Sequence, residues 1–448
     1  MEALDPRLRA MTTLFDLAQI PAGLGALLCA MDRIPMPKIE EPLRRPIASR
    51  GHALWQLGFR PFYLAAALFA ALSIGLWSLQ MQGGLPRPYL AGPVWHAHEM
   101  IFGFAVAVIV GFLFTAGHNW TGQATPTGGR LAALVGLWLA GRVLVLTPWG
   151  WAAALANVAF PLAAAAALAV PLARSGNRRN YFFVALLVAI GIASLAVHLG
   201  QLGVLAAPPW LGIQVALDML LFILAVMGGR VIPMFTNNGV RGVDARRDPW
   251  VERVALGSVL ALLAADLFAL DPVDIAGIAA IAALAHLLRL LLWQPWRTGR
   301  VPLVWVLHLA YAWIPIHLAL RALAGAGVVS SSLSVHALTA GALGGLVIGM
   351  MTRTSRGHTG RPLKADRWDV ACYALVALAA LLRVAVPLAL PAAYPAALAL
   401  SGLAWSLAFA LFAVRYGPWL TRVRMDGRPG MNRAPREGGS SGFPPARE

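Results

Sequence analysis

The sequence predicts an all-α polytopic membrane protein with about twelve transmembrane helices and with both termini cytoplasmic. The first observation is composition, because 59% of the 448 residues are hydrophobic, 12% are charged and the mean hydropathy is +0.69. Soluble globular proteins are less apolar and more charged than this. The second observation is that apolar stretches of about twenty residues, the length that crosses a bilayer as a helix, recur along the whole chain.

Taken in order, these stretches predict twelve spans. They fall at residues 62–80, 94–116, 131–148, 151–173, 181–200, 209–229, 250–270, 273–294, 302–322, 334–352, 369–388 and 394–415. The connections between them are short, so the sequence contains no soluble domain that could house a catalytic centre. Any chemistry must therefore take place among the helices.

The predicted membrane domain covers residues 53–418, and a segment of different character flanks it on each side. Residues 1–52 are expected to be a cytoplasmic segment, whose short apolar run near residues 22–31 fits an interfacial helix better than a secretory signal. Residues 424–448 are rich in Gly, Pro, Ser and Arg and have few apolar residues. Such a composition cannot build a core, so we expect a disordered basic tail.

The net charge of +17 is distributed unevenly between the two membrane faces. With the N-terminus inside, nearly all Lys and Arg residues in loops lie on the cytoplasmic side, and only Arg87 and Arg321 lie outside. Anionic lipid headgroups attract this excess, so membrane lipid is an expected partner and nucleic acid is not. The two cysteines, Cys29 and Cys372, predict neither a disulfide framework nor a thiolate metal site.

Seven of the ten histidines lie in or at the mouths of the predicted spans: His96, His98, His198, His286, His308, His317 and His336. An ionisable ring at membrane depth costs free energy unless a partner, a cavity or a metal satisfies it. Neutral imidazole binds haem iron and copper, and the ligands that favour other metals are scarce here. The set therefore predicts a haem or copper site, while a hydrogen-bonded packing residue is the alternative for each single histidine.

Depth along the helices divides these seven histidines into two layers. Five lie in the outer third, and His286 and His308 form a deeper layer near the inner ends of their helices. His96 and His98 are about 200° apart around a regular helix, so only one of them is expected to bind a given ion. Glu99 beside them suits a proton carrier or a partner of a ligating imidazole, and a helix cap is equally consistent with its position.

Small residues follow several of these histidines at helical spacing, and they predict a flat wall beside a porphyrin. They are Gly103, Ala107 and Gly111 after His96, Ala340 and Gly344 after His336, and Ala279 and Ala282 before His286. Close helix packing uses the same spacing. We expect packing for Gly341, Gly345 and Gly349, which have no histidine on their stripe.

Charged residues inside the predicted spans need partners. The simplest expectation is a mutual salt bridge between Arg142 in the third span and Asp218 in the sixth. Arg230, at the inner end of the sixth span, is expected to be a positive anchor at the membrane surface or a partner for haem propionates.

Five phrases in the chain resemble the NnrS family. They are GFRPFYLAAALFA at 58–70, VWHAHEMIFGFAVAVIVGFLFTAGHNWTG at 94–122, MGGRVIPMFTNN at 227–238, LHLAYAWIPI at 307–316 and HALTAGALGGLVIGMMTRTSRGHTGRPL at 336–363. The resemblance implies a bacterial inner-membrane protein that carries haem, with b-type expected, and copper, and that protects against nitric oxide. By position, the family's histidines correspond to His96, His98, His286, His308, His336 and His358. Which of them binds which metal stays open.

The function predicted at this point is a haem-containing inner-membrane protein that binds nitric oxide and reduces or detoxifies it. Glu99 is the candidate for the proton path, and the electron donor is unknown. A multi-pass transporter and a donor of haem or copper to respiratory proteins are the alternatives. On depth alone, His52 and His118 are expected to contribute nothing to the haem spectrum.

Overall fold

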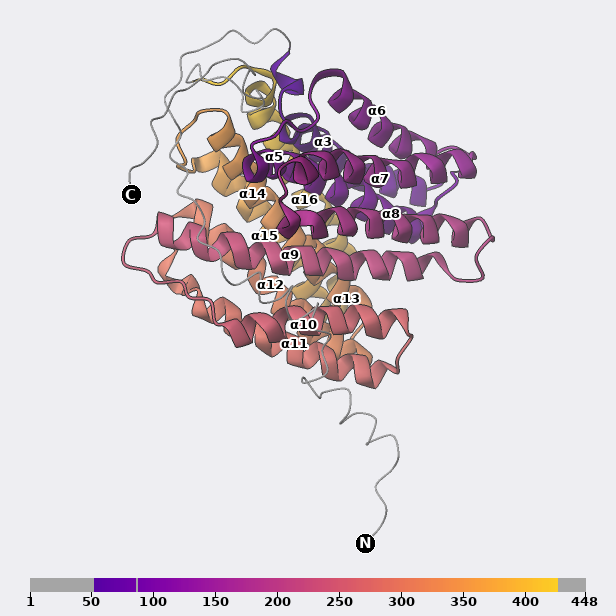
Figure 1. Cartoon of the computed structure of the whole chain (residues 1–448). Coiled ribbons are helices and arrows are strands. Elements are labelled where there is room, and N and C mark those ends of the chain that lie inside the picture. Colours follow the sequence, from indigo (N-terminus) through magenta and orange to yellow (C-terminus); the bar gives the residue numbers. More distant parts are fainter. Residues whose placement is uncertain (1–51, 86–87, 426–448) are drawn as a thin grey trace, which may run out of the picture. The chain divides into compact units, whose positions relative to one another are not determined.

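The structure is a computed structural model that describes residues 52–85 and 88–425. The predicted N-terminal segment, except for His52, and the predicted tail, except for residues 424 and 425, lie outside this range. All regular structure in the described residues is helical (Figure 1), which confirms the predicted fold class.

Twelve helices in the described residues match the twelve predicted spans. They are α3 (Phe59–Met81), α4 (Gly92–His98) continued by α5 (Val106–Thr121), α6 (Gly128–Leu144), α7 (Gly150–Arg174), α8 (Tyr181–Gln201), α9 (Pro209–Gly239), α10 (Pro249–Leu267), α11 (Pro272–Leu292), α12 (Pro302–Gly325), α13 (Ser331–His336) continued by α14 (Gly344–His358), α15 (Arg367–Ala389) and α16 (Tyr394–Thr421). Short 3₁₀ turns lie at η2 (Ala53–Trp55), η4 (Arg178–Asn180), η5 (Pro295–Arg297) and η7 (Pro391–Ala393).

Ten of these helices are long and apolar enough to cross a membrane. The other two are α6, which has 17 residues, and α10, which carries Glu252, Arg253 and Asp266. We call the end of the helices next to residues 88–91 the outer end and the opposite end the inner end, after the charge distribution expected from the sequence.

Helix boundaries follow from local chemistry. Proline occupies the first turn of α9, α10, α11 and α12, where the missing N–H costs nothing. Asp248 caps α10 by accepting from the backbone N–H groups of Trp250 and Val251. Asp366 and Asp369 form a capping box at the start of α15.

Two helices contain a π-helical segment directly after a histidine. The segment η3 (Glu99–Ala105) follows His98 between α4 and α5, and η6 (Ala337–Leu343) follows His336 between α13 and α14. A π turn inserts an extra residue and changes which face the flanking side chains occupy, and such turns concentrate at functional sites. The angle of about 200° between His96 and His98 holds for a regular helix, and the helix is regular only up to His98.

The predicted porphyrin walls are filled by neighbouring helices, so that prediction was wrong for the glycines that carry it. A methyl group on Gly103 would meet Arg142 and Phe69, and one on Gly344 would meet Trp405. Gly111 is equally close to Phe62. Packing is confirmed for Gly341, Gly345 and Gly349, which approach Trp313, Ala310 and Leu307. Small residues serve close approach here because side chains of adjacent helices occupy the space beside them.

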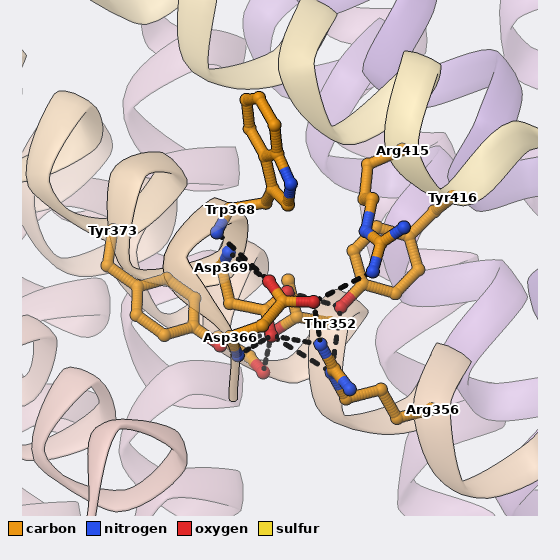
Figure 2. Close-up of polar contacts among 9 residues, drawn as sticks. Thr352, Arg356, Asp366, Trp368, Asp369, Tyr373, Arg415 and Tyr416 are labelled. Atoms are coloured by element: carbon orange, nitrogen blue, oxygen red, sulfur yellow. Dashed lines mark hydrogen bonds and ion pairs between the residues drawn. The ribbon is translucent and has the colours of Figure 1, made fainter. Parts of the chain in front are cut away.

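A cluster of buried polar side chains ties the inner ends of α14, α15 and α16 together (Figure 2). Arg356 on α14 lies 2.6 Å from the Asp369 carboxylate and 2.8 Å from Asp366, and Tyr416 on α16 donates to Asp369 at 2.5 Å. Burial alone would raise the pKa of Asp366, but hydrogen bonds from Arg415 and the Asp369 backbone hold it below its usual range. These contacts fix the position of the α14 end, which carries His358.

Candidate functional site

Four imidazoles gather near the outer end, and we call them the outer histidine cluster: His96, His98, His198 and His336. They come from α4, α8 and α13. The ring of His96 lies 6.3 Å from that of His336 between centroids, with an interplanar angle of 11°. The ring of His98 lies 4.9 Å from that of His198 at 72°. The cluster therefore consists of two pairs, one nearly parallel and one nearly perpendicular.

One nitrogen of several of these rings is held by a hydrogen bond. The Nδ1 of His98 lies 2.8 Å from Glu99 Oε1, and the Nδ1 of His336 donates to the Ser332 carbonyl at 2.7 Å. The Nδ1 of His198 lies 3.2 Å from the Tyr89 hydroxyl. Burial raises the pKa of Tyr89 to about 12, so this hydroxyl stays protonated and donates to the His198 carbonyl at 3.2 Å.

The remaining ring nitrogens are free to bind something else. The Nε2 atoms of His98 and His198 and the Nδ1 of His96 are buried and have no hydrogen-bond partner among the described residues. A buried polar atom without a partner is costly. An imidazole with one nitrogen held by oxygen and the other unpaired has the arrangement of a metal ligand. The side chains present therefore fit an imidazole-bound metal.

The ring separations agree with this interpretation. A ligating nitrogen lies about 2 Å from its metal, so two rings on opposite sides of one ion have centroids about 6 Å apart, and rings at a tetrahedral angle about 5 Å apart. The His96–His336 pair matches the first separation and the His98–His198 pair matches the second. Within the part of the chain that the structure describes, no three His, Cys, Asp or Glu side chains converge on one point. Additional ligands, such as porphyrin nitrogens, would have to complete either site.

Glu99 is fully buried between a ring of the cluster and a guanidinium. It contacts His98 on one side, and Arg142 Nε lies 3.1 Å from its other oxygen. Arg142 is also held by Asn157 on α7. Glu99 is therefore the carboxyl group next to the candidate metal ligands, and it does not cap a helix, because it lies at the start of the π segment.

The predicted salt bridge between Arg142 and Asp218 is wrong. Arg142 pairs with Glu99, and Asp218 lies 2.6 Å from Arg321, which also contacts Asp266. Arg321 was counted on the outer side in the sequence analysis, although it falls within the predicted span 302–322, and α12 continues past it to Gly325. Because Arg321 was counted with the outer-side charges, it was not considered as the partner of Asp218.

His286 and His308 lie in separate polar environments. His286 donates from Nε2 to the Ala255 carbonyl at 3.1 Å, and its Nδ1 lies 2.6 Å from the Tyr311 hydroxyl. His308 lies 2.8 Å from the Thr236 hydroxyl through Nε2, and its Nδ1 has no partner among the described residues. Both nitrogens of His286 are thus used within the protein.

His317 faces α13 beside the outer cluster and makes no ring contact with it among the described residues. Its Nδ1 donates to the Ser334 carbonyl at 2.8 Å, and its buried Nε2 has no partner there. His317 therefore resembles a metal ligand in having one bonded and one unpaired ring nitrogen, but no second imidazole in the described residues faces it.

The twelve helices and the outer cluster can now be compared with known proteins. The family model described as NnrS protein matches residues 53–424. The chain belongs to the NnrS family. The match runs from the 3₁₀ turn before α3 to the residues just after α16, so it covers every helix of this NnrS-family chain that the structure describes. No curated protein matches the chain.

Arg230 of the NnrS chain lies at the inner end, away from the outer cluster in its contacts. Its Nη1 donates to Asn180 at 3.2 Å, and its guanidinium lies over the rings of Phe182 and Phe183. Its Nε and Nη2 are buried without a partner among the described residues. Arg230 therefore has N–H groups available to bind an anion, which a partner of haem propionates needs.

Several residues of the site carried no signal in the sequence. Trp77 stacks on His96 at 4.5 Å, Tyr89 holds His198 from a loop, and Asn157 holds Arg142. Each acts through contacts between helices distant in sequence, which hydropathy and helical spacing do not report. Only the folded structure, in which these helices lie side by side, identifies them.

Proposed function

We propose that this NnrS-family protein is a haem-containing membrane protein that binds nitric oxide and reduces or detoxifies it. The observation that carries the proposal is the outer histidine cluster, in which His96, His98 and His198 each keep a buried nitrogen without a partner among the described residues and His98 contacts the buried carboxyl group of Glu99. Imidazoles placed this way serve metal binding better than packing, because packing histidines satisfy both nitrogens.

The two ring pairs suit different metals. Imidazoles placed as those of His96 and His336 would hold the iron of a b-type haem. Imidazoles placed as those of His98 and His198 would hold copper, for which imidazole is a suitable ligand. A redox metal with an open position supplies the binding of nitric oxide and the transfer of electrons to it.

The protein's own groups provide for protons. Reduction of two nitric oxide molecules to nitrous oxide and water takes up two protons and two electrons. Glu99 lies 2.8 Å from His98 Nδ1, and Arg142 Nε lies 3.1 Å from its other oxygen. Glu99 is therefore placed to hold a proton and pass it toward the His98–His198 pair. The electrons must come from an external donor.

Nitric oxide needs no soluble binding domain to reach this site. It is small and apolar, so it partitions into the bilayer and enters between helices. We place the protein in the bacterial inner membrane with cytoplasmic termini, in agreement with the charge distribution of the sequence.

An absorbance spectrum and metal analysis of the purified full chain test the proposal. We expect a Soret band that shifts when nitric oxide is added, together with iron and copper in the preparation. His336→Ala and His98→Ala should each remove part of this signal, whereas His52→Ala, a change at an exposed residue, should leave it intact. A folded wild-type protein with no porphyrin and no copper would refute the proposal.

A transporter is the second candidate, and the contact between Arg321 and two carboxylates favours it. Asp218 and Asp266 share this guanidinium and the Gln214 amide at the outer end. Two carboxylates with one cation leave an excess negative charge inside the helices, as in ion pathways. Uptake of a polar solute by liposomes containing the protein, lost in Asp218→Asn, would support this candidate over the first.

A further inference from the structure

The outer histidines His96 and His336 have counterparts at the inner end of the same two helices. His118 follows His96 by 22 residues, and His358 follows His336 by the same 22 residues. At 1.5 Å per residue this separation is about 33 Å, close to the bilayer core thickness of about 30 Å. Both inner histidines also directly follow a glycine, Gly117 and Gly357.

The two helices also share their local structure. Each carries one π-helical segment near its outer histidine and then runs as regular α-helix to its inner histidine. Equal spacing places His118 and His358 equally far along their helices from the outer histidines.

The start of α3 links the inner histidines. The backbone N–H of Phe59 donates to the Thr115 hydroxyl at 3.2 Å, one turn before His118. The ring of Phe59 lies 5.5 Å from the ring of His358. Thr115, one turn before His118, and His358 therefore both contact Phe59.

Hydrogen bonding repeats the pattern of the outer pair. The Nδ1 of His118 donates to the Gln123 carbonyl at 2.7 Å, as His336 does to Ser332, and its Nε2 makes no hydrogen bond within the described residues. The Nδ1 of His358 is buried without a partner there, as it is for His96. Each pair thus joins one anchored imidazole to one with an unpaired Nδ1.

The charges around the inner pair differ from those at the outer end. Arg60 is fully buried, and its Nη1 donates to the carbonyls of Leu420 and Arg422. Its Nε and Nη2 have no partner, and no carboxylate within the described ranges pairs with it. Arg424 donates to the His358 carbonyl. These cations disfavour a bare metal ion, and they favour a ligand that brings carboxylates, as an iron porphyrin does.

We propose that His118 and His358 hold a second haem at the inner end, with a haem carboxylate paired to Arg60. The cofactor is the one of the proposed function, on which the second site therefore rests, but the residues that hold it are different. It reverses the expectation, drawn from depth alone, that His118 is spectrally silent. The protein then carries haem near both membrane faces.

Haem stoichiometry of the purified full chain is the first test, and it needs no variant. We expect two haems per chain from the pyridine haemochrome and iron content. One haem or fewer per fully loaded chain overturns the second site. A single haem lost in His336→Ala would leave the proposed function standing, whereas no haem at all would end both proposals.

Variants then locate the second haem. His118→Ala and His358→Ala should each lose about half of the Soret absorbance and keep the half that His336→Ala removes, and His52→Ala should keep all of it. Full haem content in folded His118→Ala and His358→Ala overturns the proposal. Far-UV circular dichroism and gel filtration identify folded samples.

A cavity variant separates ligation from a structural role. His118→Gly should regain the missing absorbance when imidazole is added, because the free ring replaces the lost ligand. Arg60→Gln should bind the inner haem more weakly and lose it first on dilution. Absence of imidazole rescue, in a variant that is folded and retains the outer haem, counts against His118 as a ligand.

Discussion

The outer histidine cluster and a polar network on α9–α12, formed by Glu252, Arg289, Tyr311 and His286, both bury histidines and charged residues. The histidine of the network has both ring nitrogens hydrogen-bonded, whereas histidines of the cluster do not. In the network, Glu252 pairs with Arg289 at 2.5 and 2.6 Å, Arg289 donates to Tyr311, and Tyr311 contacts His286, whose second nitrogen is also bonded. In the cluster, His98 and His198 keep an unpaired Nε2. The comparison teaches that burial alone does not make a histidine a candidate ligand, and that a buried nitrogen without a partner is the more selective sign.

Breaking the network should have the largest effect on stability and none on metal content. Glu252→Ala leaves the buried Arg289 guanidinium without its carboxylate, which costs about 3 to 5 kcal/mol. We expect a strongly lowered thermal midpoint in detergent and an unchanged haem spectrum per folded molecule. The matched control is Arg246→Ala, which removes an exposed pair with Asp244 and should cost at most about 1 kcal/mol. Loss of haem from folded Glu252→Ala would show that the network is part of the site.

Replacing one histidine by alanine in each region tests the difference between the two regions directly. His286→Ala removes two internal hydrogen bonds and should destabilise the protein by about 1 to 3 kcal/mol without spectral change. His198→Ala removes a ring with an unpaired nitrogen, so it should lower copper content and change stability less. Copper analysis and thermal unfolding of both variants decide the matter. The opposite assignment, with copper lost in His286→Ala, would place the metal in the α9–α12 region.

The fold was predictable from the sequence because transmembrane helices depend on local length and apolarity. All twelve predicted spans correspond to helices, and even the two that do not pass as apolar spans, α6 and α10, were located. The depth of the histidines was predictable for the same reason. His96, His98, His198 and His336 were assigned to one layer and they meet in one cluster.

Pairing between helices was not predictable from the same information. The partners of Arg142 and Asp218 were assigned incorrectly, because two buried charges of opposite sign were joined without knowledge of which helices touch. The π segments after His98 and His336 were also missed, since hydropathy has no period that marks them. Both features depend on contacts between residues that are far apart in the sequence. A single sequence does not show which of its residues make such contacts.

The smallest predicted effect concerns the group that orients a ring of the cluster. Tyr89→Phe removes the hydroxyl that lies 3.2 Å from His198 Nδ1 but keeps the ring that stacks on it at 5.7 Å. Loss of an orienting hydrogen bond on a ligating histidine weakens metal affinity by about 10- to 100-fold. We expect the lower end of this range, because Tyr89 lies in a loop and the stacked ring remains. Competition with a copper chelator measures the change, and Gln82→Ala, in the same loop and exposed, is the control. Equal copper affinity in Tyr89→Phe and wild type would mean that His198 binds no metal through the nitrogen opposite this hydrogen bond.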